Sequence, residues 1–340
     1  MKGIVCEEAG KFIYREDLPE PALKEGEAII RIQRVGICGT DLHAYQGNQP
    51  YFTYPRVLGH ELAGRIEAIG ENSYKLHTGD QVSIIPYIHC GECIACRNGK
   101  TNCCVSMKVF GVHVDGGMRE RIAVPISHLI NTEGLTLDQS AMLEPLAIGA
   151  HAVRRSGLQP EETALVIGAG PIGLGIMALA KALGAKVIAM DVNEERLKYC
   201  RSWAKVDDTV NALEQPKEQI SLITKGEFPT VVFDATGNVK SMMGAFNLAS
   251  HGGRIVFVGL VKDEITFDDP EFHSRELTLM GSRNATKADF DHVLSVIRNG
   301  HMDISRYITH GSAFGNMINE FNAWLKPESK VIKAVVRLED

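Results

Sequence analysis

The pattern of hydrophobic and polar positions changes character near residue 157. Before this point, short runs rich in β-branched residues alternate with turn glycines and prolines, as in EAIIRIQRVG, GRIEAIG and DQVSII. This pattern predicts an irregular, mainly β domain. After it, short apolar runs such as TVVFDATG and GRIVFVGL end in small residues, as buried parallel strands do. We therefore expect two domains of different architecture, with no internal repeat in either.

The second half contains a strand, a helix and a strand in close succession. The run TALVI is expected to form a buried strand, an apolar-periodic helix is expected from about Pro171 to Leu183, and the second strand, KVIAMD, ends at Asp191. The turn before the helix holds the pattern G-x-G-x-x-G, which is specific only in this strand-turn-helix context. The unit therefore indicates a dinucleotide-binding domain.

Each glycine of this turn has a separate expected role. We expect a tight turn at Gly168, close approach of the backbone to a pyrophosphate at Gly170, and close packing of helix on strand at Gly173. The phosphates would lie at the helix N-terminus. Asp191, eighteen residues after the last glycine, would accept hydrogen bonds from the ribose hydroxyls and repel a 2′-phosphate, which favours NAD over NADP. The predicted cofactor-binding residues are Gly168, Gly170, Pro171, Ile172, Gly173, Asp191 and Arg196.

Composition adds limits to this picture. The chain has 340 residues, of which 44% are hydrophobic and 23% charged, and its formal net charge is -6. The length favours two domains, and the absence of a basic stripe argues against nucleic acid as a partner. The N-terminus has no apolar signal region and no long apolar run follows. We therefore expect a cytoplasmic protein that binds no membrane, in which disulfides are disfavoured.

The stretch CGECIACRNGKTNCC holds five of the eight cysteines. Cys90, Cys93, Cys96 and Cys104 follow the spacing C-x2-C-x2-C-x7-C, which suits a closed, structural zinc site of four thiolates. An iron-sulfur cluster and a set of unligated thiols are the alternatives, although the run lacks the Cys-Pro ending of bacterial ferredoxins. By position alone, Cys103 could replace Cys104.

A second set of candidate ligands lies in GICGTDLHAY and YPRVLGHELAG. Cys38, His60 and Glu61 together offer a thiolate, an imidazole and a carboxylate, a mixed set that suits a catalytic zinc with an open coordination position. Glu144 follows among apolar neighbours, where a carboxylate is costly unless it binds a metal or pairs. Taken singly, Cys38 and His60 are also typical of ordinary core residues.

The chain resembles the zinc-type medium-chain alcohol dehydrogenases along essentially its whole length. The segments that carry this resemblance are, in order, GICGTDLH, GHE, the cysteine-rich stretch, EPLAIGAHA and VIGAGPIGLG. The similar branch contains the sorbitol (polyol), threonine and sugar-acid dehydrogenases. The resemblance implies an α/β protein with a GroES-like, mainly β catalytic domain at 1-148, which includes a structural-zinc lobe at about 88-106. A doubly wound Rossmann NAD-binding domain would follow at 149-278, and residues 279-340 would return to complete the first domain.

The resemblance also assigns roles. It implies two zinc ions per chain: a structural one with Cys104, not Cys103, as the fourth ligand, and a catalytic one bound by Cys38, His60 and Glu61. Glu144 would be a direct or water-mediated partner that exchanges with Glu61, and it would take part in catalysis. In the cysteine-type alcohol dehydrogenases a cysteine stands at this position, so the carboxylate indicates the polyol branch.

For the reaction, the resemblance implies that zinc acidifies a substrate hydroxyl and that the carbon-bound hydrogen leaves as hydride to NAD. Thr40 would relay the proton through the nicotinamide ribose to His43. Arg283 and Asn284 are candidate substrate contacts, similar in position to an arginine that meets substrate in polyol dehydrogenases.

The segments YPRVLGHE and GVHVDGGM resemble bacterial members that oxidise sugar acids such as L-galactonate or L-idonate. We therefore expect a secondary alcohol of a sugar acid or polyol as the small-molecule substrate. The alternatives are L-threonine 3-dehydrogenase, sorbitol dehydrogenase, and a catalytically silent dinucleotide-binding regulatory protein. The family suggests a homo-oligomer, either a dimer or a tetramer.

Overall fold

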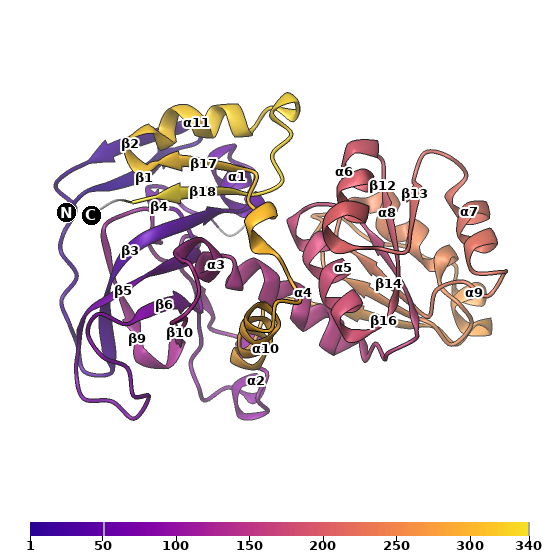
Figure 1. Cartoon of the computed structure of the whole chain (residues 1–340), viewed down its shortest axis with the longest axis horizontal. Helices are drawn as coiled ribbons and strands as arrows, with labels where there is room; N and C mark the ends of the chain where they lie inside the picture. Colours follow the sequence, from indigo (N-terminus) through magenta and orange to yellow (C-terminus); the bar gives the residue numbers. More distant parts are fainter. Residues whose placement is uncertain (50–51, 339–340) are drawn as a thin grey trace. The chain divides into compact units, whose positions relative to one another are not determined.

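The computed structural model describes residues 1–49 and 52–338 and divides into two compact units (Figure 1). The first unit comprises Met1–Glu144, Thr286–Arg298 and Asp303–Asp340, and the second comprises Pro145–Ala285 and Asn299–Met302. The chain thus leaves the first unit, builds the second and returns. Within the described residues, no helix has the length and apolar character needed to span a membrane.

The first unit is mainly β, as the hydrophobic pattern predicts. Its largest sheet has the order β10-β6-β5-β3-β18-β17, with β9 also paired to β3. The strands of this sheet are β3 (Glu27–Ile37), β5 (Glu61–Ile69), β6 (Gln81–Ile84), β9 (Arg121–Pro125), β10 (Leu129–Asn131), β17 (His310–Ala313) and β18 (Ala334–Arg337). Smaller sheets contain β1 (Gly3–Glu8), β2 (Lys11–Arg15) and β4 (Arg56–Val57), and β7 (Tyr87–Ile88) with β8 (Lys108–Val109).

The C-terminal strand β18 is central to this sheet rather than an addition to its edge. It runs antiparallel to β3, with Ala334 opposite Ile37, and parallel to β17. β-branched residues of β3 and β18 enter one apolar core together with aromatic residues from the helix α11 (Met317–Trp324). The return of the chain therefore completes the core of the first unit.

Short helices connect these strands. They are α1 (Gly39–Tyr45), α2 (Ile94–Arg97), α3 (Leu137–Ala141), the start of α4 (Leu143–Ser156), and α10 (Lys287–Arg298), with 3-10 turns at Thr101–Cys103, Ile126–His128, Ile304–Arg306, Phe314–Asn316 and Pro327–Ser329. Helix α3 begins with a capping box, in which the Thr136 hydroxyl accepts a hydrogen bond from the Gln139 N–H and the Gln139 side chain accepts one from the Thr136 N–H. Such a box satisfies two otherwise unpaired donors.

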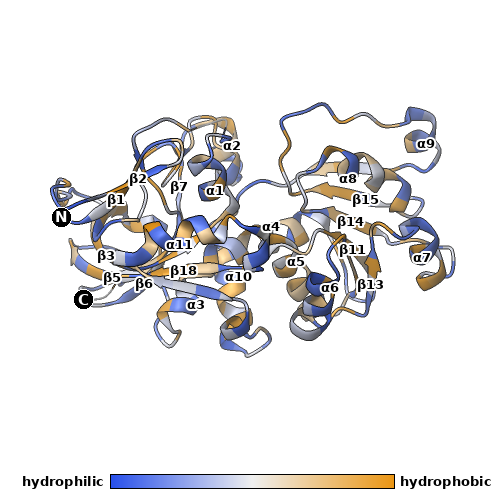
Figure 2. Cartoon of the chain, turned by 90° about the horizontal axis from the view of Figure 1, so that it is seen from above, coloured by the Kyte–Doolittle hydropathy of each residue, from blue (hydrophilic) through white to orange (hydrophobic). Residues whose placement is uncertain are grey.

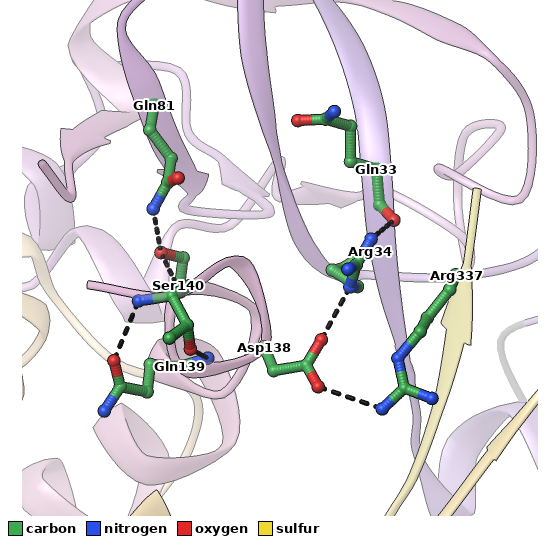
Figure 3. Close-up of polar contacts among 8 residues, drawn as sticks. Gln33, Arg34, Gln81, Asp138, Gln139, Ser140 and Arg337 are labelled. Atoms are coloured by element: carbon green, nitrogen blue, oxygen red, sulfur yellow. Dashed lines mark hydrogen bonds and ion pairs between the residues drawn. The ribbon is translucent and has the colours of Figure 1, made fainter. Parts of the chain in front are cut away.

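Polar contacts fix α3 on the sheet (Figure 3). The Asp138 carboxylate accepts from Arg34 of β3 at 2.6 Å and from Arg337 of β18 at 3.0 Å. Gln81 of β6 donates to the Ser140 hydroxyl at 3.0 Å. Since Glu144 follows α3 by three residues, these contacts help to place it.

The second unit is a six-stranded parallel sheet of order β13-β12-β11-β14-β15-β16. Its strands are β11 (Thr163–Ile167), β12 (Lys186–Asp191), β13 (Asp208–Asn211), β14 (Val231–Asp234), β15 (Arg254–Phe257) and β16 (Thr278–Gly281). Its helices are α5 (Pro171–Leu183), α6 (Glu194–Tyr199), α7 (Pro216–Ile223), α8 (Val239–Gly244) and α9 (Asp269–Ser274), with a π-helix at Cys200–Ala204 and a 3-10 turn at Ala245–Leu248. Apolar strands lie between helices on both faces (Figure 2). This is the doubly wound order of a dinucleotide-binding domain, and the predicted fold class is confirmed.

Candidate active site

Three predicted metal ligands come together in the first unit. Cys38 follows β3 and precedes α1. Glu61 begins β5, the strand paired with β3, and His60 directly precedes it. One ligand atom from each residue lies within 4.8 Å of the others. We call Cys38, His60 and Glu61 the donor group.

The Glu61 side chain is fully buried and depends on room left by a glycine. A Cβ added to Gly36, its partner on β3, would lie 2.0 Å from Glu61 Oε2. Lys333, which directly precedes β18 and is also buried, donates from Nζ to Glu61 Oε1 and, at 3.0 Å, to the Ile37 carbonyl. Within the described part of the chain, Glu61 Oε2 has no hydrogen-bond partner. One carboxylate oxygen is thus held by a cation, and the other is left for a ligand.

The Asp41 carboxylate lies near one ring nitrogen of His60. Its Oδ1 lies 3.7 Å from His60 Nδ1, and its carboxylate also accepts the backbone N–H groups of Cys38, at 2.9 Å, and Gly59, at 3.3 Å. A carboxylate facing one ring nitrogen is a common way to orient a ligating histidine. Asp41 thereby links the two segments that carry the donor group.

Glu144 lies close by but differs in its surroundings. It is buried at the start of α4, and its Oε1 accepts a hydrogen bond from the Tyr87 hydroxyl of β7. Burial raises the pKa of Glu144 to about 7, with Glu61 adding to the effect. Burial also raises the pKa of Tyr87, with the Glu144 charge as a further cause, so the phenol stays a donor.

The electrostatics of the donor group favour a cation. Burial alone would lower the pKa of His60, but Asp41 and Cys38 outweigh it and raise that pKa well above its ordinary value. The pKa of Lys333 is likewise raised by Glu61 and Cys38 against the effect of burial. The donor group offers a thiol, an imidazole and a carboxylate oxygen without a partner, in surroundings that stabilise positive charge. Such a set fits a zinc ion.

Thr40 and His43 both lie on α1, just after Cys38. Thr40 is half-buried and His43 is exposed in the last turn of the helix. The structure therefore carries both predicted relay residues on the segment that follows Cys38, a predicted metal ligand.

The four cysteines Cys90, Cys93, Cys96 and Cys104 form a second cluster, with all four Sγ atoms within 4.8 Å of one another. The Cys93–Cys96 and Cys90–Cys104 Sγ pairs are each 3.5 Å apart, close to the about 3.8 Å edge of a tetrahedron with Zn–S bonds of about 2.3 Å. Backbone N–H groups of Cys96 and Val105 lower the pKa of the Cys93 thiol to about 6, whereas burial and the Cys93 side chain raise the pKa of Cys96 to about 12. The fit to zinc therefore rests on the distances between the Sγ atoms. The residues therefore fit a closed zinc site.

Cys103 is exposed and stands outside this cluster. The structure thus brings Cys104, and not its neighbour, to the other three thiols. Sequence position alone had left the two open.

The glycine-rich turn of the second unit has the expected local geometry. Gly168 has a φ of +96°, which favours glycine, and a Cβ at Gly173 would lie 1.8 Å from the Gly168 carbonyl oxygen. A Cβ at Gly170 would meet no atom within 4 Å, and Gly170 caps α5 with Pro171 and Ile172 in its first turn. This leaves backbone and open space at the helix N-terminus, as phosphate binding requires.

Asp191 ends β12 beside this turn. Its carboxylate accepts the Ala169 N–H at 2.6 Å and the Asn193 N–H at 2.8 Å. Each carboxylate oxygen has two lone pairs, so Asp191 can hold the turn and still accept a ribose hydroxyl. Arg196 lies half-buried on α6.

Arg283 and Asn284 follow β16 in the second unit, Arg283 exposed and Asn284 with a φ of +52°. Three residues of the first unit that contact the candidate ligands are not predicted from the sequence: Asp41, Tyr87 and Lys333. A lysine within the apolar run KVIKAVV was the available signal for Lys333, because lysine is rarely buried without a partner. Nothing in the local pattern distinguished Tyr87.

Comparison with known proteins identifies the family. Residues 24–134 match the alcohol dehydrogenase GroES-like domain, and residues 171–299 match the zinc-binding dehydrogenase domain. L-galactonate-5-dehydrogenase of Escherichia coli (strain K12) is 42% identical over 337 residues, which cover 99% of this chain and 98% of the relative. L-idonate 5-dehydrogenase of Vitis vinifera is 33% identical over 310 residues, 86% of this chain and 83% of the relative. The crystal structure of the rspB dehydrogenase from E. coli CFT073, complexed with NADH, is 30% identical with a TM-score of 0.91 and covers 99% of each chain.

The protein has a GroES-like unit that carries the donor group and a doubly wound unit of the kind that binds dinucleotides. These features define the class of metal-dependent dehydrogenases. The chain belongs to the zinc-type medium-chain alcohol dehydrogenase family. The resemblance drawn from the sequence is confirmed, and the protein is an oxidoreductase that acts on a small-molecule alcohol. Zinc and a nicotinamide dinucleotide, the predicted cofactors, are those of the family.

Proposed function

We propose that the protein oxidises a secondary alcohol of a sugar acid or polyol to a ketone and transfers hydride to NAD+. The observation that carries the chemistry is the donor group, whose buried carboxylate oxygen without a partner, at Glu61, faces a thiol and an imidazole. The relative that acts on L-galactonate, similar over nearly the whole chain, supports a sugar acid as the substrate class.

In this proposal Cys38, His60 and Glu61 hold the catalytic zinc. A zinc ion bound there supplies Lewis-acid polarisation of the alcohol. The Asp41 carboxylate, 3.7 Å from His60 Nδ1, would orient the ring by its charge. Lys333 occupies Glu61 Oε1 and would leave Oε2 to the ion. Glu144 is the nearby second carboxylate.

The proton and the hydride leave by different routes. As the alcohol carbon becomes the carbonyl carbon, its hydrogen would pass with two electrons to NAD+. The hydroxyl proton would pass to Thr40, which would relay it through the nicotinamide ribose to His43. His43 is exposed, so it can pass the proton on to solvent. This relay is carried over from the family onto residues that stand at the matching positions.

NAD is the proposed cofactor rather than NADP. Asp191 places a carboxylate beside the glycine-rich turn, where it would bind ribose hydroxyls and repel a 2′-phosphate. Gly168, Gly170, Pro171, Ile172 and Gly173 would hold the pyrophosphate, with Arg196 nearby. Arg283 and Asn284 remain proposed substrate contacts, and the homo-oligomeric state and cytoplasmic location remain predictions.

The four-cysteine cluster is proposed as a structural zinc site. Four thiolates complete a tetrahedral shell and leave no position for substrate. It follows that the reaction belongs to the donor group and that loss of the lobe zinc acts first on stability.

A substrate screen tests this function directly. L-galactonate, L-idonate, sorbitol and L-threonine are each supplied with NAD+ or NADP+, and reduced cofactor is followed by absorbance. We expect sugar acids to give the highest kcat/KM, with NAD+ preferred. L-threonine as the best substrate would replace the proposed substrate class, and no turnover of any alcohol would favour a regulatory dinucleotide-binding protein.

A further inference from the structure

Tyr87 is the first residue of β7, which pairs with β8 to form the stem of the loop that carries the cysteine cluster. In the two-stranded sheet of β7 and β8, Tyr87 pairs with Val109 and Ile88 pairs with Lys108, and the loop between the strands contains residues 90–104. The stem is fixed to the rest of the unit, because His128 Nε2 donates to the Tyr87 carbonyl at 3.1 Å. Tyr87 is therefore held by the strand pairing of the stem and by a contact from outside the lobe.

The side chain of Tyr87 leaves the stem and ends at a carboxylate of the candidate active site. It is 4% exposed, and its ring packs edge-on against Phe290 of α10, with centroids 6.5 Å apart. Its hydroxyl donates to Glu144 Oε1. A buried phenol aimed at a buried carboxylate satisfies both groups, and neither would be stable there alone.

The two carboxylates near the metal position are held by unlike donors. Lys333 holds Glu61 by a charge, while Tyr87 holds Glu144 by a neutral hydroxyl. Among the described residues, the set of mutually close donor atoms contains Glu61 with Cys38 and His60, and it does not contain Glu144. The Tyr87 hydroxyl is the side-chain donor that the structure shows on Glu144.

We propose that Tyr87 is a positioning residue: its hydroxyl keeps Glu144 beside the donor group instead of within it, and the stem of the cysteine lobe presents that hydroxyl. The inference rests on the proposed function, because it takes the donor group as the catalytic zinc site.

Cobalt reports the coordination of such a site without any substrate. When Co²⁺ replaces zinc, the site absorbs visible light, and this absorption weakens as the coordination number rises. Cobalt bound by the four cysteines of the lobe should absorb equally in wild type and variant, so a difference between their spectra reports on the donor group. In Tyr87→Phe we expect Glu144 to enter the coordination shell, so the donor-group absorption weakens and shifts. We also expect kcat/KM to fall roughly tenfold, a typical effect of removing a contact on a ligand. An unchanged spectrum with unchanged kcat/KM would overturn the proposal, whatever happens to stability.

Two further variants make the test specific. Tyr45→Phe removes another buried phenol of the same unit, one that donates to the Gly10 carbonyl at 2.7 Å, and it should leave the cobalt spectrum as in wild type. In a Glu144→Gln background, Tyr87→Phe should add no further spectral change; an equal change in both backgrounds would contradict a role through Glu144. If Tyr87→Phe fails to fold, Phe290→Leu, which loosens the ring of Tyr87 but keeps its hydroxyl, should give a smaller change of the same sign.

The spectral result separates this inference from the proposed function. A protein that oxidises none of the alcohols, yet shows the spectral change in Tyr87→Phe, would contradict the proposed reaction and support the role of Tyr87. A protein that oxidises a sugar acid, but whose cobalt spectrum and kcat/KM do not change in Tyr87→Phe, would support the proposed reaction and contradict the role of Tyr87.

Discussion

Lys333 is buried beside Glu61, and its ammonium group is the counter-charge of that carboxylate. It donates to Glu61 Oε1 and to the Ile37 carbonyl, and both charged side chains are almost fully removed from water. Removing one partner of a buried ion pair leaves an uncompensated charge. In a metal site, however, a bound cation supplies part of the missing compensation.

This reasoning gives a prediction for Lys333→Met. In metal-free protein we expect the free energy of unfolding to fall by about 3–5 kcal/mol, and zinc should restore a large part of the loss. Urea unfolding with and without zinc, compared with wild type under the same conditions, measures both effects. Lys333→Arg keeps the positive charge, so its free energy of unfolding should fall by less than that of Lys333→Met. An equal loss at both metal levels would show that Glu61 does not face the ion.

At the scale of elements, the helix α3 is tied to two strands through one carboxylate. Arg34 and Arg337 converge on Asp138 (Figure 3). Partial burial alone would raise the pKa of Asp138, but hydrogen bonds from Arg337 and Arg34 outweigh it and hold the pKa below its ordinary value of 3.8. Because the folded-state pKa is the lower one, the ionised carboxylate stabilises the fold above the unfolded-state pKa, and this contribution is lost as the pH falls through the folded-state value.

Asp138→Asn should therefore destabilise the protein at neutral pH by about 1–2 kcal/mol, since these bonds are charged but partly exposed. The difference from wild type should shrink as the pH falls below 3.8. Urea unfolding across this pH range measures it. As a matched control, Asp291→Asn removes an exposed carboxylate paired with Lys287, and it should cost less than about 0.5 kcal/mol. A difference for Asp138→Asn that does not depend on pH would argue against the ion pairs.

Elements also show where sequence reasoning succeeds. The turn from Gly168 to Gly173 lies within one short segment, so local spacing is enough to predict its geometry. The cysteine spacing predicts a cluster, but it does not choose between Cys103 and Cys104. The donor group required more, because Cys38 and His60 meet only through the pairing of β3 with β5; here the family resemblance supplied what the spacing could not.

At the scale of the whole molecule, the residues that were missed are those brought in by topology. Lys333 reaches Glu61 across 272 positions, because β18 returns to pair with β3. Tyr87 reaches Glu144 because a short stem places it there. The fold class, the cofactor turn and the donor residues could be predicted from the sequence, but the charges and hydroxyls that hold the two carboxylates depend on the assembled sheet.

The central claim is that one chain has two metal sites with different roles, a closed one in the cysteine lobe and an open one at Cys38, His60 and Glu61. The most direct test is the zinc content per chain of wild type and of Cys38→Ser, measured by elemental analysis of the folded proteins. The account predicts two zinc ions in wild type and one in Cys38→Ser, with NAD+ reduction lost and the lobe zinc retained. Fewer than two zinc ions in wild type, or the same content in Cys38→Ser with activity preserved, would contradict it.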